Sequence, residues 1–170
     1  MAKPFLNIDD IPEDGWMPWS RGDKFEARLG QVAARLGAKK LGYNVTVVPP
    51  GKRAFPHHSH HVNEEMFFIL EGEAELRFGE QTHAVRKGDV IACPPGGAEV
   101  AHQLINTGAG DLKYLAVSTV ESPEVALYPD SGKYGTMLSL GERLPDGRPN
   151  ALRFFAREQA TMDDYWDGEE

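Results

Sequence analysis

The residues of this chain best suited to chemistry are four histidines and two glutamates in one short stretch. They are His57, His58, His60, His61, Glu64 and Glu65. Imidazole and carboxylate groups together are typical ligands of Zn, Mn, Fe, Ni and Cu ions. The stretch contains no cysteine, which argues against a structural Cys-rich zinc site. An apolar run at 66–70 follows, so the sequence predicts a metal-binding segment directly ahead of a strand.

Two pairs of histidines compete for the ligand role. Successive side chains of a strand point to opposite faces, so His58 and His60 share one face and His57 and His61 share the other. We favour His58 and His60, because adjacent positions on one face bring both rings to a single ion. His57 and His61 are then expected to support the ligands or to lie at the rim of the site.

Two spaced sets of residues resemble the two motifs of the cupin superfamily. The first motif, G-x5,6-H-x-H-x3,4-E-x6-G, is matched by Gly51, His58, His60, Glu65 and Gly72. The second motif, G-x5-P-x-G-x2-H-x3-N, is matched by Gly88, Pro94, Gly96, His102 and Asn106. The sequence departs from the second motif between Gly96 and His102, where five residues stand in place of two.

The resemblance implies a site for one divalent transition metal ion: Zn, Mn, Fe, Ni or Cu. Its implied ligands are His58, His60, Glu65 and His102. Glu65 is preferred to Glu64 because its distance from Gly72 matches the motif. The alternative for His102 is a buried histidine bonded to the backbone. Three imidazoles and one carboxylate leave two positions of an octahedral ion open to water or substrate.

The resemblance includes small cupins similar to sugar-phosphate isomerases. We therefore expect a metal-dependent, isomerase-like enzyme that acts on a small polar carbonyl or sugar-like substrate. A non-haem metal dioxygenase and a non-catalytic domain that binds a small ligand remain open alternatives, because this fold hosts many chemistries. The sequence identifies no catalytic acid or base, and no cofactor site besides that of the metal.

Five other positions have structural interpretations. Cys93 precedes two prolines and is expected to be a small buried core residue, and His83 is expected at the surface. Asn106 is expected to close the turn that follows it. Phe67 and Ile69 share the face of Glu65 and should form an apolar wall of the cavity.

Outside the motifs, the pattern is that of an all-β protein. Short apolar runs bounded by turn residues predict strands over 41–48, 66–70, 73–78, 82–85, 90–93, 100–106, 112–120, 125–128 and 134–140. Such a succession favours a sandwich or barrel, which the cupin resemblance narrows to a double-stranded β-helix, or jelly-roll barrel. Residues 23–37 fit either a short helix or a strand followed by a turn.

We expect a single cupin domain over 1–170. Its N-terminal arm and first elements occupy 1–40, the barrel occupies 41–140, and a C-terminal extension occupies 141–170. Because the edges of an open sheet must be covered, we also expect a homodimer. Residues 1–24, or Tyr165 and Trp166 in the acidic tail, are the candidates to cover a neighbouring subunit.

Composition narrows the partners and the compartment. The 170 residues include 18 basic and 26 acidic ones, for a net charge of −8 with no basic stripe, so we expect no nucleic-acid partner. No apolar run approaches the roughly 20 residues of a membrane helix, and the N-terminus lacks the features of a signal peptide. With one cysteine and hence no intramolecular disulfide, we expect a cytoplasmic protein without a membrane partner.

Overall fold

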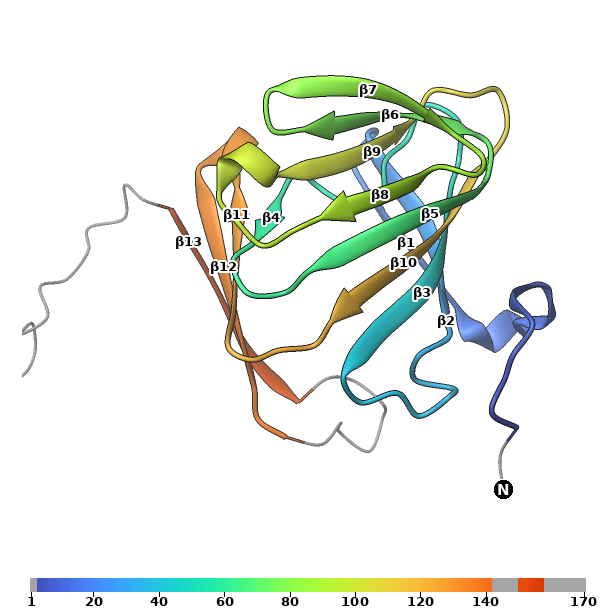
Figure 1. Cartoon of the computed structure of the whole chain (residues 1–170), viewed down its shortest axis with the longest axis horizontal. Coiled ribbons are helices and arrows are strands. Elements are labelled where there is room, and N and C mark those ends of the chain that lie inside the picture. Colours follow the sequence, from blue (N-terminus) through green and yellow to red (C-terminus); the bar gives the residue numbers. More distant parts are fainter. Residues whose placement is uncertain (1–2, 142–149, 158–170) are drawn as a thin grey trace, which may run out of the picture.

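The computed structural model describes residues 3–141 and 150–157, and within them the regular structure is antiparallel strands and four short 3-10 turns. One layer is a six-stranded sheet (Figure 1). In spatial order it consists of β1 (Trp16–Arg21), β2 (Phe25–Gln31), β3 (Leu41–Val48), β10 (Leu112–Thr119), β5 (Glu65–Glu71) and β8 (Val90–Cys93). The expected all-β class is confirmed.

The opposite layer consists of two smaller sheets. One has the order β13 (Ala151–Arg157), β12 (Lys133–Ser139), β11 (Glu124–Tyr128) and β4 (Ser59–His60). The other has the order β7 (Gln81–Arg86), β6 (Glu73–Phe78) and β9 (His102–Asn106). The segment around β4 joins the two, because isolated bridges link Arg53 to Ile105 and His58 to His102. The segment predicted to bind a metal ion therefore lies along this seam.

The core between the layers is built from alternate residues of the strands. Its buried members are Ala27, Val48, Ala54, Phe67, Ile69, Ala74, Leu76, Ile91, Cys93, Leu104, Leu112 and Tyr114. A second, smaller cluster contains Ile11, Val32 and Val45. Val45 and Val48 lie an odd number of residues apart in β3, so they point to opposite faces. The second cluster therefore covers the outer face of the six-stranded sheet.

The N-terminal arm packs on its own chain. Trp16 packs against the second apolar cluster and donates a hydrogen bond from Nε1 to the carbonyl oxygen of Ile11. Trp19 stacks on Phe55, with ring centroids 5.9 Å apart. The homodimer stays a prediction, and Tyr165 and Trp166 lie outside the described residues.

Most strands begin and end within two residues of their predicted bounds. Residues 23–37 form β2 and a following turn, as in the second of the two predicted alternatives. The sequence pattern did not predict β13, which pairs with β12 from Lys133↔Arg157 to Ser139↔Ala151. The extension predicted at 141–170 thus contributes a strand to the second layer.

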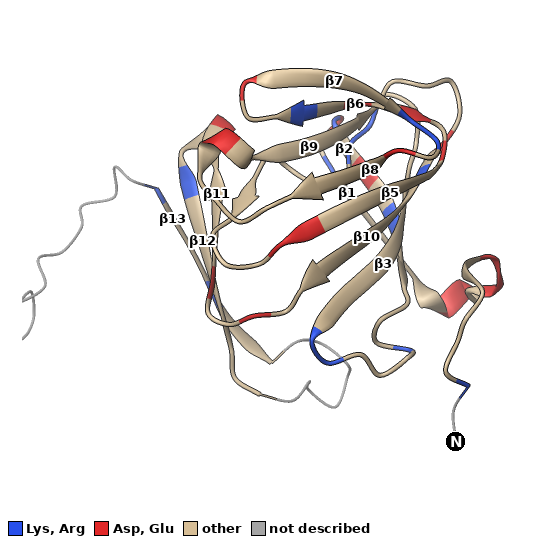
Figure 2. Ribbon diagram, viewed as in Figure 1, with Lys and Arg blue, Asp and Glu red and all other residues tan. Residues whose placement is uncertain are grey.

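Charged residues are spread over many elements. Figure 2 shows acidic groups at the start of β5 and in η4 (Pro129–Ser131), with basic groups on β6, β12 and β13. The other 3-10 turns are η1 (Ile8–Asp10), η2 (Glu13–Gly15) and η3 (Ala98–Val100). No helix within the described ranges is long and apolar enough to cross a lipid bilayer.

Candidate metal centre

The fold brings together the four side chains named by the two motifs. His58, His60, Glu65 and His102 each offer one ligand atom, and these atoms all lie within 4.8 Å of one another. That spread suits donors gathered around one ion, because metal–ligand distances for such groups are about 2.0–2.2 Å. His102 is buried and the other three are partly buried.

The donors come from both layers of the barrel. His58 pairs with His102 across the seam, and His60 pairs with Ala126 of β11. Glu65 is the first residue of β5 in the six-stranded sheet. Its Oε2 lies 3.2 Å from Nε2 of His102 and 3.6 Å from Nε2 of His60. The carboxylate therefore reaches from one layer to the imidazoles of the other.

Two of the imidazoles are oriented by the backbone. Nδ1 of His58 lies 2.8 Å from the carbonyl oxygen of Pro56, and Nδ1 of His102 lies 3.2 Å from that of Val100. A carbonyl oxygen only accepts hydrogen bonds, so Nδ1 of each ring carries the proton. Nε2 of both rings is therefore unprotonated and able to bind a metal ion, as is usual for histidine ligands.

His60 shows most directly that the donor set fits a metal ion. Both of its ring nitrogens are buried, and neither has a hydrogen-bond partner among the described residues. Leaving a buried polar atom unsatisfied costs about 1–3 kcal/mol. An ion shared with His58, Glu65 and His102 would satisfy Nε2, and the mixture of imidazole and carboxylate suits a divalent transition metal.

The protonation of the site is set by burial and by contacts among its members. Burial, reinforced by the ring of His102, lowers the pKa of His58 to about 4. Burial alone would raise the pKa of Glu65, but its close contacts with His102 and His60 hold that pKa well below its usual range. Neutral imidazole and ionised carboxylate are the forms that bind metals, so these two residues are ready to do so near neutral pH.

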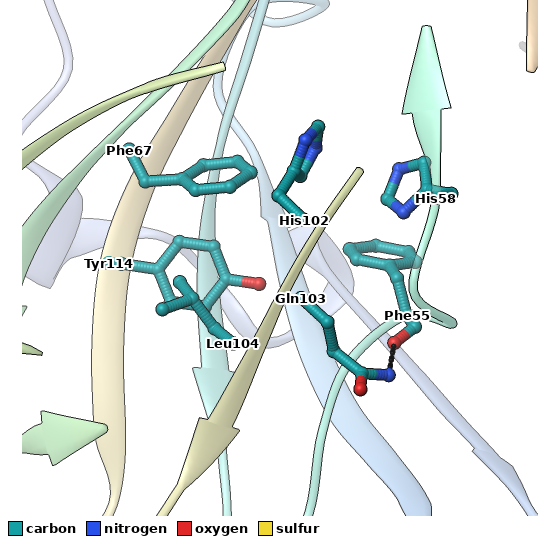
Figure 3. Close-up of a pocket in the computed structure, with 7 residues that line it drawn as sticks. All are labelled: Phe55, His58, Phe67, His102, Gln103, Leu104 and Tyr114. Atoms are coloured by element: carbon teal, nitrogen blue, oxygen red, sulfur yellow. Dashed lines mark hydrogen bonds between the residues drawn. The ribbon is translucent and has the colours of Figure 1, made fainter. Parts of the chain in front are cut away.

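A small cavity adjoins the donors. Figure 3 shows the rings of His58 and His102 near one another, with Phe67 and Tyr114 beyond His102. The cavity is lined by Phe55, His58, Phe67, His102, Gln103, Leu104 and Tyr114. Phe67 forms part of its wall, as predicted, whereas Ile69 belongs to the buried core and is absent from the lining.

The five residues between Gly96 and His102 have a clear structural role. They contain the 3-10 turn η3, which returns the chain to β9. The loop is tied to the donor segment, because the backbone N–H of Gly96 donates to the carbonyl oxygen of His60 at 2.8 Å. The departure from the motif therefore lengthens the loop without displacing His102 from the other donors.

The competing histidines lie outside the donor group. Nε2 of His57 is 2.9 Å from the carbonyl oxygen of Ala101, and its Nδ1 is 3.5 Å from Asp130. His61 is exposed, as is Glu64. The geometry thus gathers the favoured pair, His58 and His60, with Glu65.

The other structural interpretations agree with the observed positions. Cys93 is buried in the core, where burial, together with the charge of Glu65, raises the pKa of its thiol. His83 is exposed. The side chain of Asn106 closes its turn, accepting from the N–H of Gly108 and donating to the carbonyl oxygen of Gly110.

Sequence reasoning missed one buried carboxylate next to the site. Glu124, the first residue of β11, has its Oε2 3.5 Å from Nδ1 of His60. Glu124 belongs to neither motif, and its position in the sequence follows no pattern that includes the histidines. Only the pairing of β11 with β4 brings it to this position.

Comparison with known proteins agrees with this architecture. The cupin domain family matches residues 44–118, which run from β3 to β10 and contain all four donors. This segment of the chain is thus similar to cupin domains. An uncharacterized protein of Methanocaldococcus jannaschii is 35% identical over 72 residues, which are 42% of this chain and 54% of that protein. The match thus spans about half the length of that relative.

Solved cupin structures share the wider fold. A sugar phosphate isomerase of the cupin superfamily from Silicibacter pomeroyi superimposes with a TM-score of 0.71 at 20% identity, covering 95% of this chain and 98% of that chain. A predicted oxalate decarboxylase from Thermotoga maritima gives a TM-score of 0.57 at 25% identity, covering 69% of this chain and 99% of that chain. The predicted jelly-roll barrel is thereby confirmed.

Proposed function

We propose that this cupin is a metal-dependent isomerase of a small carbonyl or sugar-like substrate. The proposal is carried by the group of four donors, two of which, His58 and His102, also line an aromatic cavity. An ion held by these donors would adjoin the cavity. Further support comes from the sugar phosphate isomerase of Silicibacter pomeroyi, whose fold resembles this one along nearly its whole length.

The residues of the site have distinct proposed roles. One divalent ion would be held by His58, His60, Glu65 and His102, and when bound it would supply Lewis-acid polarisation of a substrate carbonyl. Phe67 and Leu104 line the cavity with apolar side chains, which would exclude water from it. Burial raises the pKa of Tyr114, so its phenol keeps its proton and is able to donate a hydrogen bond but not to accept a proton.

The first test is metal content. Protein purified without chelators should carry close to one equivalent of transition metal, and the double variant His58→Ala/His60→Ala should lose it. The exposed neighbour His61 provides a matched control, and His61→Ala should retain the metal. Equal metal in the wild type and the double variant would refute this donor set.

The second test is turnover of the metal-loaded protein. Aldose and ketose phosphates should interconvert in the absence of oxygen, and the double variant should be inactive. Oxygen consumption with a candidate substrate would instead indicate a dioxygenase. Tight binding of a small ligand without turnover in either condition would indicate a non-catalytic binding domain.

A further inference from the structure

Glu124 is a buried carboxylate surrounded by donors from one short segment. Its side chain is 4% exposed. It accepts hydrogen bonds from the backbone N–H groups of His61, Val62 and Asn63 at 3.1, 3.2 and 2.8 Å. The side-chain amide of Asn63 also donates to it. These hydrogen bonds satisfy the buried carboxylate.

This segment joins two of the proposed metal ligands. Residues 61–63 follow His60 and end just before Glu64 and Glu65. By holding three successive N–H groups, Glu124 fixes the path of the chain between the imidazole of His60 and the carboxylate of Glu65. The spacing of these two donors thus depends on a residue of another strand.

His60 is supported differently from the other two histidines of the site. His58 and His102 each place Nδ1 against a carbonyl oxygen two residues earlier in the chain. Nδ1 of His60 has no hydrogen-bond partner in the described parts of the chain, and its nearest carboxylate is Oε2 of Glu124 at 3.5 Å. The ring therefore lies between two carboxylates, with Glu65 on its Nε2 side and Glu124 on its Nδ1 side.

We propose that Glu124 is the positioning residue of His60. Its carboxylate faces the Nδ1–H of the ring, so that Nε2 is presented to a metal shared with His58, Glu65 and His102. The inference rests on the proposed metal site. Partners of this kind fix the tautomer and the orientation of a histidine ligand, and their loss typically weakens metal binding by roughly 10–100-fold.

The variant Glu124→Gln tests this role at constant side-chain volume. It removes the negative charge and places an amide N–H₂ among N–H donors. We expect Zn²⁺ affinity, measured by competition with a chelator, to fall roughly 10–100-fold. Thr119→Ala is the matched control, because Thr119 bonds the N–H of Glu64 and the side chain of Asn63 without touching His60 or Glu124. It should leave the affinity unchanged.

A double-mutant cycle separates positioning from general loosening of the segment. If Glu124 acts through His60, Glu124→Gln should cause no further loss of Zn²⁺ affinity in a His60→Ala background. An equal loss in both backgrounds, or no loss in the wild-type background, would overturn the proposal. Wild-type protein that binds neither Zn²⁺ nor Co²⁺ would overturn the metal site itself and this inference with it.

A measurement on the wild type keeps the test decisive if Glu124→Gln does not fold. Nitrogen NMR of Zn²⁺-loaded protein labelled at histidine should show His60 bound through Nε2 with a proton on Nδ1. Binding through Nδ1 would contradict the proposed orientation. A spectrum in which His60 is not bound at all would remove it from the donor group.

Discussion

The two ends of β9 carry buried polar residues of very different character. His102 at the start is 2% exposed, and Asn106 at the end is 1% exposed. Asn106 is fully satisfied: its Nδ2 donates to the carbonyl oxygens of Val48 and Gly110, and its Oδ1 accepts from the N–H of Gly108. At the other end, Nε2 of His102 lies 3.2 Å from Oε2 of Glu65. The neighbouring ring of His60 has two buried nitrogens without a hydrogen-bond partner among the described residues.

This difference separates a structural polar cluster from a site. Buried polar groups in folded proteins are nearly always hydrogen-bonded, and each exception calls for an explanation. The cluster around Asn106 closes a turn and needs nothing more. We propose that the cluster around His102 is completed by a metal ion bound to the four donors. Substitutions at the two ends should therefore affect different properties of the protein.

The largest effect is expected from His102→Ala. The variant removes a donor atom, so Zn²⁺ affinity should fall by more than the roughly 10–100-fold that loss of a supporting contact costs. Competition with a chelator measures the affinity, and urea denaturation of the metal-free protein checks that the variant is folded. Unchanged Zn²⁺ affinity would contradict the proposal that His102, unlike Asn106, is a metal ligand.

Asn106→Ala should lower the stability of the fold but not the affinity for metal. It removes three hydrogen bonds, of which the one to the carbonyl oxygen of Val48 is buried, so the free energy of unfolding should fall by roughly 3 kcal/mol, at about 1 kcal/mol per bond. Zn²⁺ affinity of the folded variant should match that of the wild type. If the fully folded variant bound Zn²⁺ more weakly than the wild type, the two ends of β9 would be coupled.

The smallest effect is expected at an ion pair near the rim. Arg77 donates to both carboxylate oxygens of Asp130, at 2.8 and 2.9 Å, and these bonds hold the pKa of Asp130 below its ordinary value. Because Asp130 is 55% exposed, Asp130→Asn should cost less than about 1 kcal/mol at pH 7. Urea denaturation of the wild type and the variant measures this cost.

The pH dependence of that cost follows from the sign of the shift. A carboxyl group whose pKa is lowered by folding stabilises the protein at pH values above its unfolded pKa of about 3.9. This contribution is lost as the pH falls through the lowered pKa of the folded state. The difference between the wild type and Asp130→Asn should therefore shrink in acid. A difference that grows in acid would contradict the assignment of the pair.

Local sequence patterns determined most of the fold. β3, β6 and β8 begin and end at the predicted residues, because alternation and turn residues act over only a few positions. The choice of His58 and His60 over His57 and His61 also follows from strand alternation. One glycine of the first motif has an equally local signature, since Gly72 has a φ of 84° at the turn between β5 and β6.

Only the tertiary structure decided what surrounds the donors. Glu124 reaches His60 through the pairing of β11 with β4, more than sixty positions apart in the numbering, and no local pattern encodes such a contact. β13 gains its place by pairing with β12, and η3 takes up the extra residues before His102. Alternation tells which residues share a face. Which distant residue lies opposite them depends on the packing of the whole chain.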